Sequence, residues 1–72
     1  MKICLRYAIV IEGEPGNYSA YVPDLPGCVT VGDTIEETRR EIQEAIRFHI
    51  EGLQEDHLPI PEPSSVVDYV EA

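Results

Sequence analysis

A strong helix-start signal lies near the middle of the chain, in Thr34-Ile35-Glu36-Glu37. The Thr34 hydroxyl can accept a hydrogen bond from the Glu37 amide, while the Glu37 carboxylate can reach back to the Thr34 amide; together they make a capping box. After this signal, apolar residues recur at steps of three and four, the spacing of one face of an amphipathic helix. The pattern predicts a helix over residues 35–54, about 30 Å long at about 1.5 Å per residue.

The segments before this helix have the character of β-strands. Residues 2–11 carry large side chains at every odd position and predict a first strand. The turn formers of residues 13–17 predict a five-residue loop, after which residues 18–22 return as a second strand. The short, β-branched stretch 28–31 predicts a third strand.

The chain after the helix is dominated by three prolines. They make residues 58–63 an extended, polyproline-like linker, and residues 66–70 then have the composition of a final strand. The element order is ββ-β-α-β. We therefore expect an α+β fold in which a three- to four-stranded antiparallel sheet carries one helix on one face, within a single domain over residues 1–72.

A single helix covers only one face of such a sheet. Ala8 and Val10 belong to the other face, and the lone phenylalanine, Phe48, falls on the polar side of the helix. These leftover apolar groups predict a homodimer or higher homo-oligomer that buries them. The alternative is that they are scattered exposed apolar residues, which are normal on protein surfaces.

The charge balance limits the partners. The chain has 14 acidic and 5 basic residues and a formal net charge of −9. Binding to nucleic acid or to an anionic membrane needs clustered Lys and Arg, so both are disfavoured, and a basic partner is favoured. The longest apolar run has four residues, Ala8 to Ile11, and the N-terminus does not resemble a signal peptide. We therefore expect a cytoplasmic protein.

Catalytic groups are sparse in this sequence. Most carboxylates fall in turns or on the exposed helix face, so no catalytic, metal or cofactor site is predicted, and the protein is not expected to be an enzyme. Cys4 and Cys28 lack metal or redox spacing, and His49 lies on the apolar stripe of the helix as a core residue would. Residual nuclease activity through Asp24 or Asp68 is a third, weaker hypothesis.

Three blocks of sequence carry a resemblance to a known family. They are residues 21–28 (YVPDLPGC), residues 32–37 (GDTIEE) and residues 59–63 (PIPEP). In their order and spacing, over nearly the whole chain, the sequence resembles the HicB family. The resemblance implies a partial, catalytically degraded RNase H fold. Members commonly have alanine where this chain has Thr38, and glycine where it has His57.

The resemblance also implies a function. HicB proteins are antitoxins of type II toxin–antitoxin systems, and they neutralise HicA, a small basic RNase that cuts mRNA, by covering its active surface. Many members add a C-terminal DNA-binding domain, which this chain, ending at Ala72, is expected to lack. The alternative is a solitary HicB-like oligomeric module that binds another protein or a ligand without a toxin partner.

If the chain is such an antitoxin, five residues are predicted to contact the partner. Two lie in the proline-rich loop, Asp24 and Leu25, and three lie at the helix start, Glu36, Glu37 and Arg40. A structural explanation competes with this one, because the loop residues can simply shape a turn and Glu37 can simply cap the helix.

Overall fold

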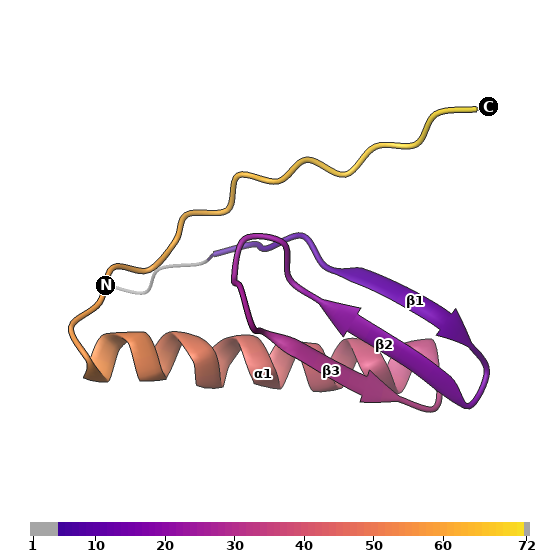
Figure 1. The fold of residues 1–72 in the computed structure, drawn as a ribbon, viewed down its shortest axis with the longest axis horizontal. Helices are drawn as coiled ribbons and strands as arrows, with labels where there is room; N and C mark the ends of the chain where they lie inside the picture. The colour runs from indigo at the N-terminus through magenta and orange to yellow at the C-terminus, as the bar shows by residue number, and fades with distance from the viewer. Residues whose placement is uncertain (1–4, 72) are drawn as a thin grey trace.

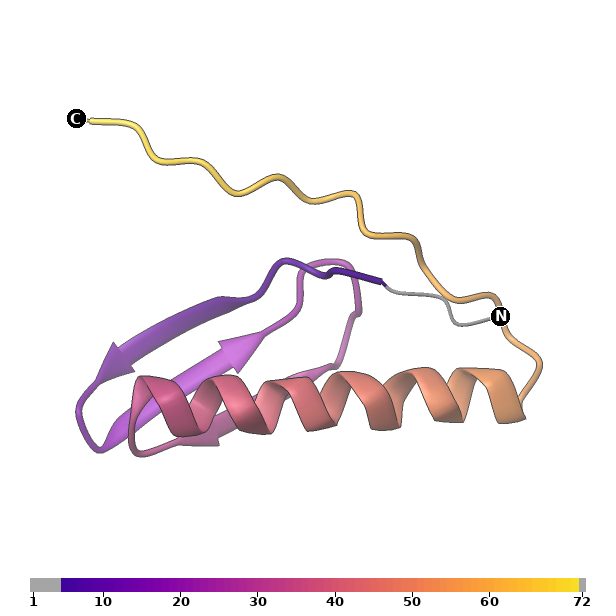
Figure 2. The ribbon, with the colours of Figure 1, turned by 180° about the vertical axis from the view of Figure 1, so that it is seen from behind.

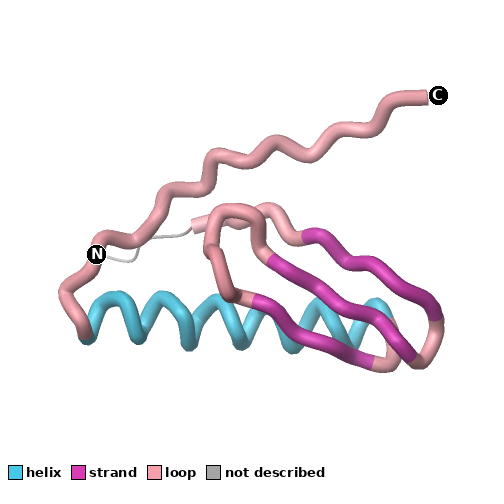
Figure 3. Tube along the Cα trace, viewed as in Figure 1, coloured by secondary structure: helices cyan, strands magenta, loops and turns pink. Residues whose placement is uncertain are grey.

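The computed structural model describes residues 5–71 and contains three strands followed by one helix. They are β1 (Val10–Glu14), β2 (Asn17–Tyr21), β3 (Val29–Gly32) and α1 (Ile35–Glu55). The strands form one antiparallel sheet in the order β1-β2-β3, and α1 lies against one face of it (Figure 1 and Figure 3). The predicted α+β class, with one helix on one side of the sheet, is confirmed.

The hairpin of β1 and β2 closes more tightly than predicted. Glu14 pairs with Asn17, so the loop consists of Pro15 and Gly16 alone rather than five residues. A proline followed by a glycine at φ 86° is the sequence of a type II turn. The Gly16 amide also donates a hydrogen bond of 2.8 Å to the carbonyl oxygen of Asp33, which ties the hairpin tip to the loop before α1.

The first strand is shorter than predicted. It begins at Val10, which pairs with Tyr21, while residues 5–9 are not part of the sheet and residues 2–4 lie outside the described range. The reason lies in the neighbouring strand: two residues after Tyr21, Pro23 has no amide hydrogen and the chain turns, so residues 5–9 have no strand to pair with. The predicted alternation still holds, since the odd-numbered side chains pack against the core: Tyr7, Ile9 and Ile11.

The predicted strand over residues 66–70 is not formed. After the extended linker the chain runs away from the sheet, as both ribbon views show (Figure 1 and Figure 2). Val66 and Val70 are 89% and 95% exposed. Strand composition is not sufficient here, because a β-strand forms only beside another strand that supplies its hydrogen bonds, and this segment has none alongside it.

The helix begins at the predicted residue. The Thr34 hydroxyl accepts a hydrogen bond of 3.0 Å from the Glu37 amide, which confirms the N-cap. Both residues lie inside the described range, and the second hydrogen bond of the predicted capping box, from the Thr34 amide to the Glu37 carboxylate, is not formed. Glu36 and Glu37 place negative charge in the first turn, where it complements the helix dipole.

The helix ends in a Schellman motif. The His57 amide donates to the Gln54 carbonyl at 3.1 Å, and the Leu58 amide donates to the Leu53 carbonyl at 2.9 Å. His57 lies in the left-handed region at φ 56°, a conformation that favours glycine. The chain then enters the proline-rich linker.

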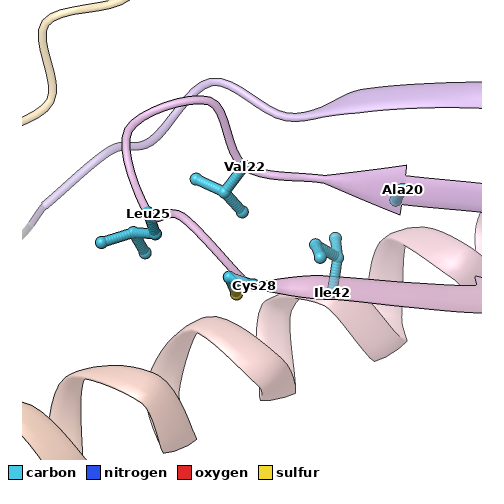
Figure 4. Packing of buried hydrophobic residues seen from close by; sticks show 5 residues of the cluster. All are labelled: Ala20, Val22, Leu25, Cys28 and Ile42. Atoms are coloured by element: carbon cyan, nitrogen blue, oxygen red, sulfur yellow. The ribbon is translucent and has the colours of Figure 1, made fainter.

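The core lies between the sheet and α1 and consists of five buried apolar side chains, shown in Figure 4: Ala20, Val22, Leu25, Cys28 and Ile42. Thr38 on α1 is also fully buried, and its hydroxyl donates to the Thr34 carbonyl oxygen at 2.7 Å. Gly32 at the end of β3 lies directly against Thr38, because a β-carbon built on Gly32 would stand 2.4 Å from the threonine hydroxyl. The close approach of β3 to α1 therefore depends on this glycine.

Candidate functional site

The proline-rich loop between β2 and β3 consists of two consecutive β-turns. The Leu25 amide donates to the Val22 carbonyl at 3.1 Å, and the Cys28 amide donates to the Leu25 carbonyl at 3.1 Å. The second turn has Pro26 followed by Gly27 at φ 85°, the sequence that a type II turn requires. The loop is thereby fixed by its own backbone.

Leu25 lies at the junction of these two turns. Its side chain is fully buried and extends into the core beside Val22 and Cys28 (Figure 4). A leucine in this position holds the loop against the sheet–helix layer and offers no side-chain surface to a partner. Its contribution to any interface is therefore to the shape of the loop.

Asp24, the neighbouring residue, faces outward and holds the C-terminal segment. Its carboxylate accepts hydrogen bonds from the amide and hydroxyl of Ser64, at 3.1 and 3.0 Å, and from the amide and hydroxyl of Ser65, at 3.1 and 2.9 Å. These bonds, with that from the Ser65 amide foremost, hold the pKa of Asp24 below its ordinary value, although partial desolvation opposes them. We call this arrangement the Asp24 clasp.

A hydrogen bond from another residue, Tyr7, supports the chain just before this segment. The Tyr7 hydroxyl donates to the Pro61 carbonyl oxygen, so residues before β1 hold the linker after α1. Burial raises the pKa of Tyr7, and the negative charges of Asp24 and Glu62 raise it further. Tyr7 therefore remains a neutral donor.

The three predicted contact residues on the helix lie elsewhere. Glu36, Glu37 and Arg40 are exposed in the first turns of α1, which follows the end of β3. The Asp24 loop precedes the start of β3, so the two groups lie at opposite ends of that strand (Figure 1). The structure brings the three helix residues together on one surface and keeps Asp24 and Leu25 apart from them.

The sheet face turned away from α1 carries an apolar row that sequence reasoning found only in part. Val10 pairs with Tyr21 and Tyr21 pairs with Val29, so these side chains lie side by side across all three strands. Tyr21 is 42% and Val29 65% exposed, and Val31 is exposed further along β3. The sequence predicts Val10 on this uncovered face. Tyr21, Val29 and Val31 can be assigned to the same face only from the pairing of the strands.

A cavity of about 460 Å³ lies between the chain before β1, the second half of α1 and the linker. Its lining is mostly apolar, with polar groups from Gln43, Arg47 and Gln54. A concave, mainly apolar space with a few polar groups has the character of a small-ligand site. The remaining lining residues are Leu5, Tyr7, Ile46, Ile50 and Ile60.

Metal-binding side chains do not cluster within residues 5–71. No set of three His, Cys, Asp or Glu side chains in this range is placed to hold a metal ion. Cys28 is buried in the core, and burial raises the pKa of its thiol, while Cys4 lies outside the described residues. In the same range, α1 is not long and apolar enough to cross a membrane.

Comparison with protein families identifies the group to which these features belong. Residues 7–72 match the model of the HicB-like antitoxins of bacterial toxin–antitoxin systems. An uncharacterised 14.9 kDa protein of Haemophilus phage HP1 is 42% identical over 66 residues, which are 92% of this chain and 50% of that protein. A UPF0150 protein of Synechocystis is 42% identical over 67 residues, covering 92% of this chain and 85% of that protein.

Relatives named as antitoxins are similar over a comparable stretch. Antitoxin HicB 1 of Photorhabdus laumondii is 38% identical over 69 residues, 93% of this chain and 44% of that protein. This chain thus spans about half the length of the phage relative and of this antitoxin.

A solved structure shares the fold. A chain of a HicA3–HicB3 toxin–antitoxin complex superposes with a TM-score of 0.71 at 32% identity, over 83% of this chain and 70% of that one. The chain belongs to the family of HicB-like antitoxins of bacterial toxin–antitoxin systems.

Proposed function

We propose that this protein is an antitoxin that binds a HicA-type RNase and neutralises it by covering its active surface. The observation that carries the proposal is the likeness, at a TM-score of 0.71, to a chain of a HicA3–HicB3 complex.

The charge of the chain supports a basic partner. With a net charge of −9, the protein attracts a basic RNA-binding surface, which speeds encounter and disfavours wrong partners more than it raises affinity. The same charge disfavours direct contact with nucleic acid or with an anionic membrane. We propose that the protein works in the cytoplasm, where mRNA is cleaved, and without a cofactor.

The contact residues that we propose fall into two groups. Glu36, Glu37 and Arg40 are exposed on α1 and can contact the partner directly. Asp24 and Leu25 act at a distance from them: Leu25 anchors the proline-rich loop in the core and Asp24 holds the C-terminal segment. A change at Leu25 would therefore act by altering the loop.

We also propose a homo-oligomer, at least a dimer. The row formed by Val10, Tyr21 and Val29 on the uncovered sheet face supplies the apolar surface that such an interface needs. Phe48 cannot share that interface, because it extends from α1, which lies on the other side of the sheet.

An RNA-cleavage assay tests the proposed function. A purified HicA-type RNase is incubated with mRNA and increasing amounts of this protein. We expect cleavage to stop near equimolar amounts, and Glu36→Lys/Glu37→Lys to require much more protein because the reversed charges repel a basic surface. Full cleavage at a large excess of the native protein would contradict the proposal.

One observation favours a second candidate, a ligand-binding module without a toxin partner. The cavity beside α1 has the size and apolar lining of a small-molecule site. A screen of small apolar acids and amides by ligand-observed NMR tests this candidate. Binding that disappears in Ile46→Phe, which fills the cavity, would support it, whereas the absence of any ligand would exclude the screened classes.

A further inference from the structure

An exposed phenylalanine stands in the middle of a row of glutamates on α1. Phe48 is 79% exposed and is the only phenylalanine of the chain. The residues of this row follow one another at alternating steps of four and three, which places them along one side of a helix. The row, which we call the Phe48 stripe, consists of Glu37, Glu41, Glu44, Phe48, Glu51 and Glu55, all of them exposed.

The Phe48 stripe is turned away from the core. Thr38 and Ile42, which are buried, mark the side of α1 that packs on the sheet. Within residues 5–71 the helix makes one ion pair, of 3.6 Å between Arg47 and Glu44, and both side chains remain largely exposed. The other glutamates of the stripe therefore present their negative charge to solvent.

A single exposed apolar side chain needs no explanation by itself, and the position of Phe48 is the informative feature. Protein interfaces concentrate their binding energy in a few central aromatic side chains that enter pockets, surrounded by a polar rim. Phe48 has this arrangement, with Glu44 before it and Glu51 after it along the same side of the helix.

We propose that the Phe48 stripe is the docking surface for the basic partner, and that Phe48 enters an apolar pocket flanked by Lys or Arg on that partner. This proposal rests on the proposed function and extends its contact residue Glu37 along the helix to Glu55. The partner contributes the positive charges that answer the glutamates, and the phenylalanine fixes the position of α1 on its surface.

Charge decides between this partner and a second copy of the chain. In a symmetric contact centred on Phe48, the two helices would place Glu44 and Glu51 of one copy against the same residues of the other. Like charges in contact are unfavourable, so this face is unsuited to self-association. The uncharged sheet row of Val10, Tyr21 and Val29 is the better self-contact.

Two pairs of variants test the proposal with a purified HicA-type toxin as the probe. Phe48→Ala removes the anchor, and the exposed helical position tolerates alanine, the best helix former. Val66→Ala, at an exposed tail residue, is its control. Glu41→Gln/Glu51→Gln removes two charges from the stripe, and Glu12→Gln/Glu14→Gln removes two exposed charges from β1. Affinity, association rate and solution mass are measured for each.

We expect Phe48→Ala to weaken binding at least about thirtyfold, mainly through faster dissociation, and Val66→Ala to leave it unchanged. The stripe double variant should associate more slowly than the β1 double variant. If the native protein binds the toxin and Phe48→Ala binds it equally well, the stripe is excluded while the proposed function stands. The same conclusion follows if Phe48→Ala and Val66→Ala lower the affinity for the toxin by the same factor. A smaller solution mass of Phe48→Ala, with unchanged binding, would assign the stripe to a second copy instead. If the native protein does not bind, both proposals fail.

Discussion

The Asp24 carboxylate accepts a hydrogen bond of 3.1 Å from the amide of Ser65, 41 positions further along the chain. With the three other bonds from Ser64 and Ser65, it fastens the segment after α1 to the loop between β2 and β3. One side chain thus connects the proline-rich loop to the two serines that directly follow the proline-rich linker.

The Asp24 clasp predicts a specific effect of removing the carboxylate. Asp24→Ala should make the amides of Ser64 and Ser65 exchange with solvent severalfold faster, because they lose their acceptor, while the sheet and α1 keep their protection. Hydrogen exchange resolved by residue measures this, and Asp68→Ala is the control. Unchanged exchange at both serines would contradict the clasp.

Acid should open the clasp. Because the folded state lowers the pKa of Asp24, its contribution is complete above the ordinary aspartate value of 3.8 and is lost as the pH falls through the lower, folded value. The amide resonances of Ser64 and Ser65 should therefore shift with a midpoint below 3.8 in an NMR titration. A midpoint at or above that value would show that the carboxylate is not held by these bonds.

Gly32 should be intolerant of alanine. The added β-carbon would meet the Thr38 hydroxyl at 2.4 Å and the Thr38 backbone at 3.1 Å, so β3 and α1 must separate. We expect Gly32→Ala to lower the free energy of unfolding by about 1–3 kcal/mol. Urea denaturation measures it. Gly52→Ala is the matched control: it meets nothing within 4 Å and should stabilise the helix by up to about 1 kcal/mol. Equal effects of the two changes would refute the close packing.

His57 should be replaceable by glycine with a gain. It holds a left-handed conformation at φ 56° in the Schellman motif, and a side chain with a β-carbon is strained there. We expect His57→Gly to raise the free energy of unfolding by about 0.5–1 kcal/mol, after allowance for the greater freedom of glycine in the unfolded chain. Thermal unfolding measures the change. His57→Ala should give no such gain; if it did, the imidazole rather than the backbone would be responsible.

The uncovered sheet face should control self-association. Val29→Asp places a charge in the apolar row beside Tyr21. Because Val29 is 65% exposed and lies outside the core, the fold should survive this change. We expect the native protein to sediment as a dimer or larger species and Val29→Asp as a monomer. Val66→Asp adds the same charge in the exposed tail and should leave the mass unchanged. A native protein that is monomeric at high concentration would exclude the oligomer.

The elements determined by local interactions were predictable from the sequence. The cap at Thr34 and the apolar stripe through Ile42 located α1, and the strand predicted over residues 18–22 differs from β2 (Asn17–Tyr21) by one residue at each end. The elements determined by pairing were not: residues 5–9 and 66–70 have strand composition, but strand formation depends on a neighbour that composition does not reveal.

The candidate site shows the same division. Leu25 is predicted from the sequence to contact the partner, yet the two turns place its side chain in the core. Asp24 is predicted from the sequence to contact the partner, whereas in the structure it binds Ser64 and Ser65. These residues are far from Asp24 in the sequence, so no local sequence pattern could have predicted that they lie close to it. The sequence places Phe48 on the polar side of the predicted helix, and the helical spacing of the glutamates around it was a signal available there; the structure adds that all these side chains are exposed.

Calorimetric titration of this protein with a purified HicA-type toxin, at low and at high salt, tests the central claim most directly. We predict a defined complex with micromolar or tighter affinity at low ionic strength, weakening as salt screens the attraction between the acidic chain and its basic partner. No binding at micromolar concentrations in low salt would contradict the claim that this protein covers such a toxin.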